Sequence, residues 1–108
     1  MSFKVFLTAD AVGDFEEIYE YIAQHDAPQK AEQVLASIEK TFKGLSESPE
    51  RGAYPKDLLT LGIRDFRQIF FKPYRVIYRI MGDRVYVLLI VDGRRDMETL
   101  LQRRLLEA

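Results

Sequence analysis

The sequence contains no cysteine and only one histidine, His25, among its 108 residues. The lack of cysteine excludes a disulfide framework, a thiolate metal site and a cysteine nucleophile. One histidine cannot form a pair of metal ligands, and we do not expect a histidine-centred triad. No G-x-G-x-x-G or G-x-x-x-x-G-K-[ST] pattern occurs, so nothing indicates a nucleotide-binding loop. We therefore predict no metal, no cofactor and no catalytic residue.

Long hydrophobic runs are also absent. The longest apolar stretch, Val85 to Val91, has seven residues, whereas a helix needs roughly twenty to cross a bilayer. No signal-peptide hydrophobic region follows the N-terminus. With 47% apolar and 31% charged residues, the chain is expected to fold as a single domain, residues 1–108. We expect a cytoplasmic protein with no membrane partner.

The net charge of −1 conceals an uneven distribution. Residues 1–60 carry six Lys/Arg against eleven Asp/Glu, whereas residues 61–108 carry ten against six. Nine of the ten arginines, all but Arg51, lie in the second half. A guanidinium group presents a planar fork that binds carboxylates, phosphates and aromatic faces. The second half is therefore the expected binding region, although strands also tolerate arginine on a solvated face.

Two helices are predicted in the first half, after a short strand at Phe3 to Leu7. Thr8 is a plausible cap for the first helix, and Pro28 suits the first turn of the second, which ends near residues 46–49. The two helices are joined by a short connection at His25-Asp26-Ala27, and this predicts an antiparallel helical hairpin. The apolar stripes of the two helices are Ala11, Phe15, Ile18, Tyr19 and Ile22, then Ala31, Val34, Leu35, Ile38, Phe42 and Leu45.

Strand periodicity replaces helical periodicity after a loop-rich crossover at residues 49–63. Three strands are predicted, at Arg64 to Phe71, Tyr74 to Met81 and Arg84 to Val91. Gly82-Asp83 suits a type II′ turn between the last two. In the middle strand one face is apolar and the other is partly basic, so the helical hairpin should cover the apolar face. Leu100, Leu101, Leu105 and Leu106 indicate a short terminal helix.

The predicted order is thus β-α-α-β-β-β with a short C-terminal helix. This is a two-layer α+β fold with a helical hairpin on a small, mainly antiparallel sheet. Four carboxylates on the first helix lie opposite its apolar stripe. We interpret them as a solvated face of the helix rather than as an acid/base pair. They are Asp10, Asp14, Glu17 and Glu20.

Arginines on the strands form the remaining candidate site. Arg75 and Arg79 share a face because their spacing is even, and a neighbouring strand can bring Arg67 close to them. Arg94 and Arg95 follow the last strand. An acidic segment of a partner, a phosphate backbone or the protein's own carboxylates could neutralise this set.

With these elements and arginines in this order, the sequence resembles the RelE/ParE toxin family of bacterial type II toxin–antitoxin modules. The resemblance is carried by the run from Tyr74 to Ile80, the hairpin, the strand Val85 to Val91, and Gly93-Arg94-Arg95-Asp96 with its leucine-rich tail. Residues of the first half also fall where that family has them. They are Leu7-Thr8, Ala11, Asp14, Ile18, Tyr21-Ile22 and the loop from Ser48-Pro49 to Gly52.

Two unrelated activities occur in this family. The resemblance to RelE-like members implies a ribosome-dependent endoribonuclease that uses lysines, arginines and a tyrosine or histidine near the C-terminus. Here Arg75 and Arg95 fall at two of the arginine positions, but the lysine positions fall on Phe66 and Gln68 and the tail tyrosine on Leu101. Phe, Gln and Leu cannot transfer a proton.

This departure favours the ParE-like branch, whose members inhibit DNA gyrase by binding and are not themselves catalysts. The resemblance implies a gyrase-inhibiting toxin that a cognate antitoxin neutralises, in a hetero-oligomeric complex and without sequence-specific binding to nucleic acid. A RelE-like nuclease and a family member that has lost toxicity and serves as a binding module are the alternatives.

The residues expected to bind gyrase or the antitoxin are Arg67, Arg75, Arg79, Arg94, Arg95, Leu101 and Arg104. Arg75, Arg79, Arg94 and Arg95 are expected to reach outward, with the tail from Met97 to Leu106 forming a short amphipathic helix. Two alternatives stay open. The leucines of the tail could close the apolar core, and Arg75 could pair with a carboxylate such as Asp65 or Asp92.

Overall fold

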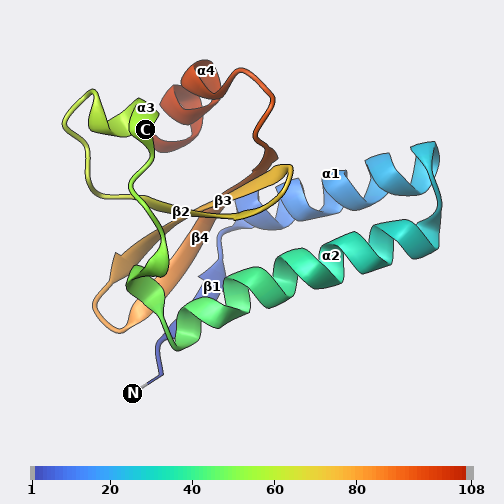
Figure 1. Cartoon of the computed structure of the whole chain (residues 1–108), viewed down its shortest axis with the longest axis horizontal. Coiled ribbons are helices and arrows are strands. Elements are labelled where there is room, and N and C mark those ends of the chain that lie inside the picture. Colours follow the sequence, from blue (N-terminus) through green and yellow to red (C-terminus); the bar gives the residue numbers. More distant parts are fainter. Residues whose placement is uncertain (1, 107–108) are drawn as a thin grey trace.

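A computed structural model describes residues 2–106 and shows a four-stranded sheet with a helical hairpin on one face and short helices on the other (Figure 1). The elements, in chain order, are β1 (Lys4–Leu7), α1 (Ala9–His25), α2 (Pro28–Lys43), α3 (Lys56–Leu59), β2 (Arg67–Phe71), β3 (Tyr74–Met81), β4 (Arg84–Asp92) and α4 (Met97–Leu101). Two 3₁₀ turns, Gly44–Ser46 and Pro49–Arg51, follow α2, and a π-helical segment, Gln102–Leu106, follows α4.

The hairpin forms as the sequence predicts. The Thr8 hydroxyl accepts the Ala11 N–H at 3.2 Å at the start of α1. Pro28 occupies the first turn of α2, where its missing N–H leaves no helical bond unmade. The rings of Phe15 and Phe42 meet edge to face, 6.2 Å apart, and fix the two helices against each other.

The strand order is β1-β4-β3-β2, with β1 parallel to β4 and the other pairs antiparallel. The predicted tight turn joins β3 to β4. Gly82 has φ +62° and Asp83 has no positive φ, as a type II′ turn requires. An irregularity between Ile77 and Tyr78 shifts the register of β3 against β4.

The main core lies between the hairpin and the sheet. It is built from the apolar stripes of the helices and the inward side chains of all four strands. Its buried members are Ala11, Ile38, Phe42, Leu45, Ile69, Val76, Tyr78, Val85, Val87 and Ile90.

The predicted α+β fold, a helical hairpin on a mainly antiparallel sheet with a short C-terminal helix, is confirmed, but a second core covers part of the opposite face, which was expected to be partly basic. α3 and α4 lie over this face in Figure 1, opposite α1 and α2. Inward-facing leucines of α4 account for the difference, because they bury strand side chains that alternation assigns to solvent. The buried members are Leu58, Phe66, Ile77, Leu89, Val91, Met97, Leu100 and Leu101.

The start of β2 and the crossover loop also differ from the sequence prediction. β2 begins at Arg67 rather than Arg64, because Phe66 turns into the second core. The crossover at residues 49–63 contains α3, whose four residues are too few to produce a detectable helical period.

Candidate functional site

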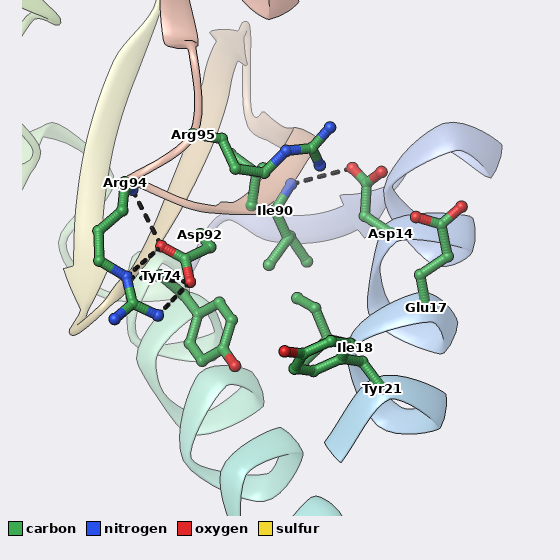
Figure 2. Close-up of a pocket in the computed structure, with 10 residues that line it drawn as sticks. Asp14, Glu17, Ile18, Tyr21, Tyr74, Ile90, Asp92, Arg94 and Arg95 are labelled. Atoms are coloured by element: carbon green, nitrogen blue, oxygen red, sulfur yellow. Dashed lines mark hydrogen bonds and ion pairs between the residues drawn. The ribbon is translucent and has the colours of Figure 1, made fainter. Parts of the chain in front are cut away.

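A cleft of about 530 Å³ lies between α1 and the C-terminal end of β4, beside the two consecutive arginines (Figure 2). Tyr21 of α1 and Tyr74 of β3 line it together with Arg94 and Arg95. The remaining lining residues are Asp14, Glu17, Ile18, Ile90, Val91 and Asp92. We call the segment after β4 that carries both guanidinium groups, residues 93–96, the arginine loop.

Arg94 is held in place by the carboxylate that ends β4. Its Nε donates to Asp92 Oδ1 at 3.0 Å and its Nη2 donates to Asp92 Oδ2 at 2.6 Å. These bonds lower the pKa of Asp92 below its usual value, against the opposing effect of partial burial. The side chain of Arg94 still keeps 78% of its exposure, so the pair positions the guanidinium at the surface without burying it.

Arg95 is exposed, and the described part of the chain supplies no ion pair to its guanidinium. Burial and the nearby Asp92 raise the pKa of Tyr74, so its hydroxyl stays protonated and able to donate a hydrogen bond. Tyr21 is 64% exposed on the facing helix. The cleft thus offers cationic, acidic, aromatic and hydroxyl groups to a partner, and its aromatic and arginine side chains are of the kinds enriched in protein interfaces.

Gly93 is the first residue of the arginine loop and directly follows the last residue of β4. Its N–H donates to the Pro73 carbonyl at 2.8 Å. A Cβ at position 93 would lie 2.9 Å from Cδ of Arg75, so a larger residue would clash with that side chain. The loop can pack this closely only with glycine at its start.

Arg75 does not reach outward, contrary to the sequence prediction. It is 8% exposed, and its guanidinium donates to Gln68 Oε1 and, at 3.2 Å, to Asp57 Oδ1. The alternative of a structural carboxylate partner is therefore correct in kind, although the partner is Asp57 rather than Asp65 or Asp92. Asp57 lies on α3, the element that periodicity did not detect.

Arg67 holds the crossover loop against β2 through hydrogen bonds. Its Nη1 donates to the carbonyls of Glu50 and Gly52 at 3.1 and 3.0 Å, and its Nη2 donates to the Tyr54 hydroxyl. The guanidinium carbon also lies 4.6 Å from the centre of the Tyr54 ring. Its donors are thus used within the fold, and it does not lie beside Arg94 and Arg95 in the cleft.

The tail residues of the predicted site also face inward. Leu101 is 2% exposed in the second core, in agreement with the alternative that the leucines close the core. Arg104 forms a two-pronged pair with Asp14 and donates to the Leu88 carbonyl at 3.1 Å. The expectation that Asp14 belongs to a solvated helix face is therefore wrong, because the carboxylate also accepts the Ile90 N–H at 3.1 Å.

Arg79 is exposed as predicted, but it lies elsewhere, beside Tyr86 near the β3–β4 turn. Of the seven predicted residues, the structure leaves Arg79, Arg94 and Arg95 exposed at the surface and brings only Arg94 and Arg95 together. Sequence reasoning missed the cleft tyrosines, Tyr21 and Tyr74. The position of Tyr21 outside the apolar stripe of α1 was the available signal.

Within residues 2–106, no helix is long and apolar enough to span a membrane, and no three His, Asp or Glu side chains are grouped as metal ligands would be.

Solved structures that share this fold include three from toxin–antitoxin systems. The chromosomal ParDE toxin–antitoxin system from P. aeruginosa matches with a TM-score of 0.71 at 20% identity, over 84% of this chain and 96% of that one. The toxin–antitoxin complex RelBE2 from Mycobacterium tuberculosis matches with a TM-score of 0.62 at 21% identity, over 85% and 99%. A double mutant of the E. coli toxin RelE in the free state matches with a TM-score of 0.57 at 16% identity, over 97% and 100%.

The sequence comparisons identify the protein family more specifically than the shared fold does. Toxin ParE3 of Caulobacter vibrioides is 31% identical over 101 residues, which are 94% of this chain and 97% of that protein. Residues 5–97 match the family model described as the ParE toxin of the type II toxin–antitoxin system parDE. The matched region includes the helical hairpin, the arginine loop and the whole sheet except Lys4, the first residue of β1. The chain belongs to the ParE toxin family of type II toxin–antitoxin systems.

Proposed function

We propose that this toxin acts in the cytoplasm by inhibitory binding to DNA gyrase and is neutralised by a cognate antitoxin. The observation that carries the proposal is the arginine loop, in which Arg94 is positioned by Asp92 and stays exposed beside Arg95, which forms no ion pair within residues 2–106. A guanidinium that is already held in place, as Asp92 holds that of Arg94, binds a carboxylate-bearing surface with little loss of side-chain freedom. The adjoining cleft supplies aromatic contacts from Tyr21 and Tyr74.

The surroundings of Arg75 favour binding over RelE-like nuclease chemistry. Phe66, which occupies one lysine position of the nuclease branch, is 7% exposed in the second core. Gln68, at the other lysine position, accepts hydrogen bonds from Arg75. Leu101, at the tyrosine position, is 2% exposed. This region is packed and internally hydrogen-bonded, and it supplies no proton-transfer group at those three positions.

The antitoxin part of the proposal follows from family membership and from the exposed basic groups. We expect a small partner, encoded by the adjacent gene, to bind through an acidic and apolar C-terminal segment that folds as it binds. The resulting hetero-oligomer should be tight and salt-sensitive.

Controlled induction in a bacterial host tests the proposal. Expression of the toxin should cause filamentation and a DNA-damage response before translation falls, because gyrase is the target. Co-expression of the adjacent gene should restore growth. Early arrest of translation without DNA damage would instead indicate the RelE-like nuclease, and normal growth with abundant folded protein would indicate a non-toxic binding module.

A further inference from the structure

The second core leaves part of its face of the sheet uncovered, toward the β3–β4 turn. Phe6 is 40% exposed and Met81 is 51% exposed, although both belong to strands. The Phe6 and Tyr86 rings stack across β1 and β4 with centres 5.6 Å apart. Arg79 is opposite Tyr86 and Met81 is opposite Arg84 in the β3–β4 register. We call these five residues the sheet-face patch.

A cavity of about 400 Å³ adjoins the patch. Arg79, Met81 and Tyr86 line one part of it, and Phe66 and Leu105 lie among the residues that line the rest. The lining is largely apolar, yet it opens to solvent beside cationic side chains. Such a hollow suits an apolar side chain carried by a partner.

The two arginines of the patch are not neutralised by an ion pair within residues 2–106. Neither Arg79 nor Arg84 forms an ion pair with any described residue. Arg84 is fully exposed, its guanidinium carbon lies 5.8 Å from the centre of the Phe6 ring, and its Nη1 donates to the Tyr86 hydroxyl at 3.4 Å. The hydrogen bond to Tyr86 raises the pKa of the Arg84 guanidinium, and the charge of the adjacent Asp83 adds to this effect.

Other nearby carboxylates are already engaged. Asp10 lies 3.8 Å from Nε of Arg104, and Asp14 binds the other end of the same guanidinium. The patch therefore combines an exposed phenylalanine, a half-buried tyrosine, an exposed methionine and two cations, and aromatic and arginine side chains are enriched in energetically important interface sites. Its charge is complementary to an acidic ligand and repels a basic one.

We propose that the sheet-face patch is the docking surface for the acidic, apolar segment of the antitoxin. The proposal rests on the proposed function and adds the contact surface. An apolar side chain of the segment fills the cavity beside Met81 and Tyr86, while carboxylates of the segment pair with Arg79 and Arg84. This surface is separate from the arginine loop, which lies at the other end of β4.

Charge reversal tests the surface directly. The probe is the purified product of the gene adjacent to this toxin, titrated into the full chain by isothermal calorimetry. Arg79→Glu combined with Arg84→Glu should weaken binding at least about tenfold, because both ion pairs become repulsive. The matched control, Lys30→Glu with Arg64→Glu, changes the net charge equally at exposed positions outside the patch and should bind within about threefold of wild type.

Circular dichroism and thermal melting of both double variants establish that they are folded. Equal binding of the folded patch variant and wild type would overturn the docking surface while leaving the proposed function intact. Failure of the wild-type chain to bind the adjacent gene product would contradict the antitoxin part of the proposed function, and the docking surface with it.

Methionine oxidation provides a second readout without any mutation. Met81 is 51% exposed, whereas Met97 is 7% exposed in the second core and serves as an internal reference. Hydrogen peroxide should oxidise Met81 quickly in the free toxin and several-fold more slowly in the antitoxin complex, as measured by peptide mass spectrometry. An unchanged rate for Met81 in a saturated complex would contradict the proposal.

Discussion

Arg104 and Asp14 lie ninety residues apart in the sequence and form a two-pronged ion pair, with both N–O distances at 2.9 Å. The side chains retain only 19% and 13% of their exposure. The pair joins the C-terminal tail to α1, and a third contact joins Asp14 to β4 through the Ile90 N–H. One carboxylate thus connects three segments of the chain.

Replacing that carboxylate should destabilise the fold. Asp14→Ala leaves the Arg104 guanidinium with only the more distant, exposed Asp10 carboxylate and leaves the Ile90 N–H without an acceptor, so we expect a loss of about 2–3 kcal/mol. Glu16→Ala, at an exposed position on the same helix, is the control and should cost within about 0.5 kcal/mol. Urea unfolding of the two variants measures the difference, and equal midpoints would show that the ion pair adds nothing.

Tyr78 should prove equally important for the crossover loop. Its side chain is fully buried, its hydroxyl donates to the Pro49 carbonyl at 2.6 Å and it accepts the Gly52 N–H at 3.0 Å. Tyr78→Phe removes both bonds and should lower the free energy of unfolding by about 1–3 kcal/mol. Tyr21→Phe, at a 64% exposed site, should leave it nearly unchanged. Thermal melting that fails to separate the two variants would contradict this role.

Leu101 should stabilise the fold through its packing in the second core. At 2% exposure in the second core, truncation to alanine removes buried methyl groups and leaves a cavity, so Leu101→Ala should cost about 2–5 kcal/mol. Leu106 is 40% exposed, and Leu106→Ala serves as the control with a much smaller effect. Denaturant unfolding gives both values. A near-neutral Leu101→Ala would mean that the tail contributes little to the fold.

The Arg94–Asp92 pair predicts a measurable titration. Because hydrogen bonds from Arg94 lower the pKa of Asp92, Arg94→Ala should return that pKa toward its ordinary value. A carboxyl group with a lowered pKa in the folded state adds stability above its unfolded pKa, and that stability disappears as the pH falls through the folded pKa. Carbon-13 NMR titration of the Asp92 carboxyl in both proteins measures the shift, and coincident curves would refute the interaction.

Local periodicity was sufficient to predict the helical hairpin and the β3–β4 turn. The Ala11 to Ile22 stripe, Pro28 and Gly82 each determine local geometry without help from distant residues. The second core was not predictable in this way. Ile77 occupies a position that alternation assigns to solvent, and it is buried only because α4 and α3 return across the sheet.

The candidate site was predictable only in part for the same reason. Sequence spacing correctly placed Arg94 and Arg95 together after the last strand. It could not show that Arg75 meets Asp57 or that Arg104 meets Asp14, since both contacts depend on tertiary structure. Arginine content alone does not distinguish a guanidinium used inside the fold from one presented to a partner.

Inhibition of purified gyrase by wild-type toxin and by the double variant Arg94→Ala with Arg95→Ala tests the central claim most directly. Both arginines are exposed, so the double variant should melt within a few degrees of wild type. Wild type should block supercoiling and accumulate cleaved DNA, whereas the double variant should need at least about tenfold more protein for the same effect. Failure of the wild-type toxin to inhibit gyrase would contradict the proposed function, and full inhibition by the folded double variant would show that the arginine loop does not face gyrase.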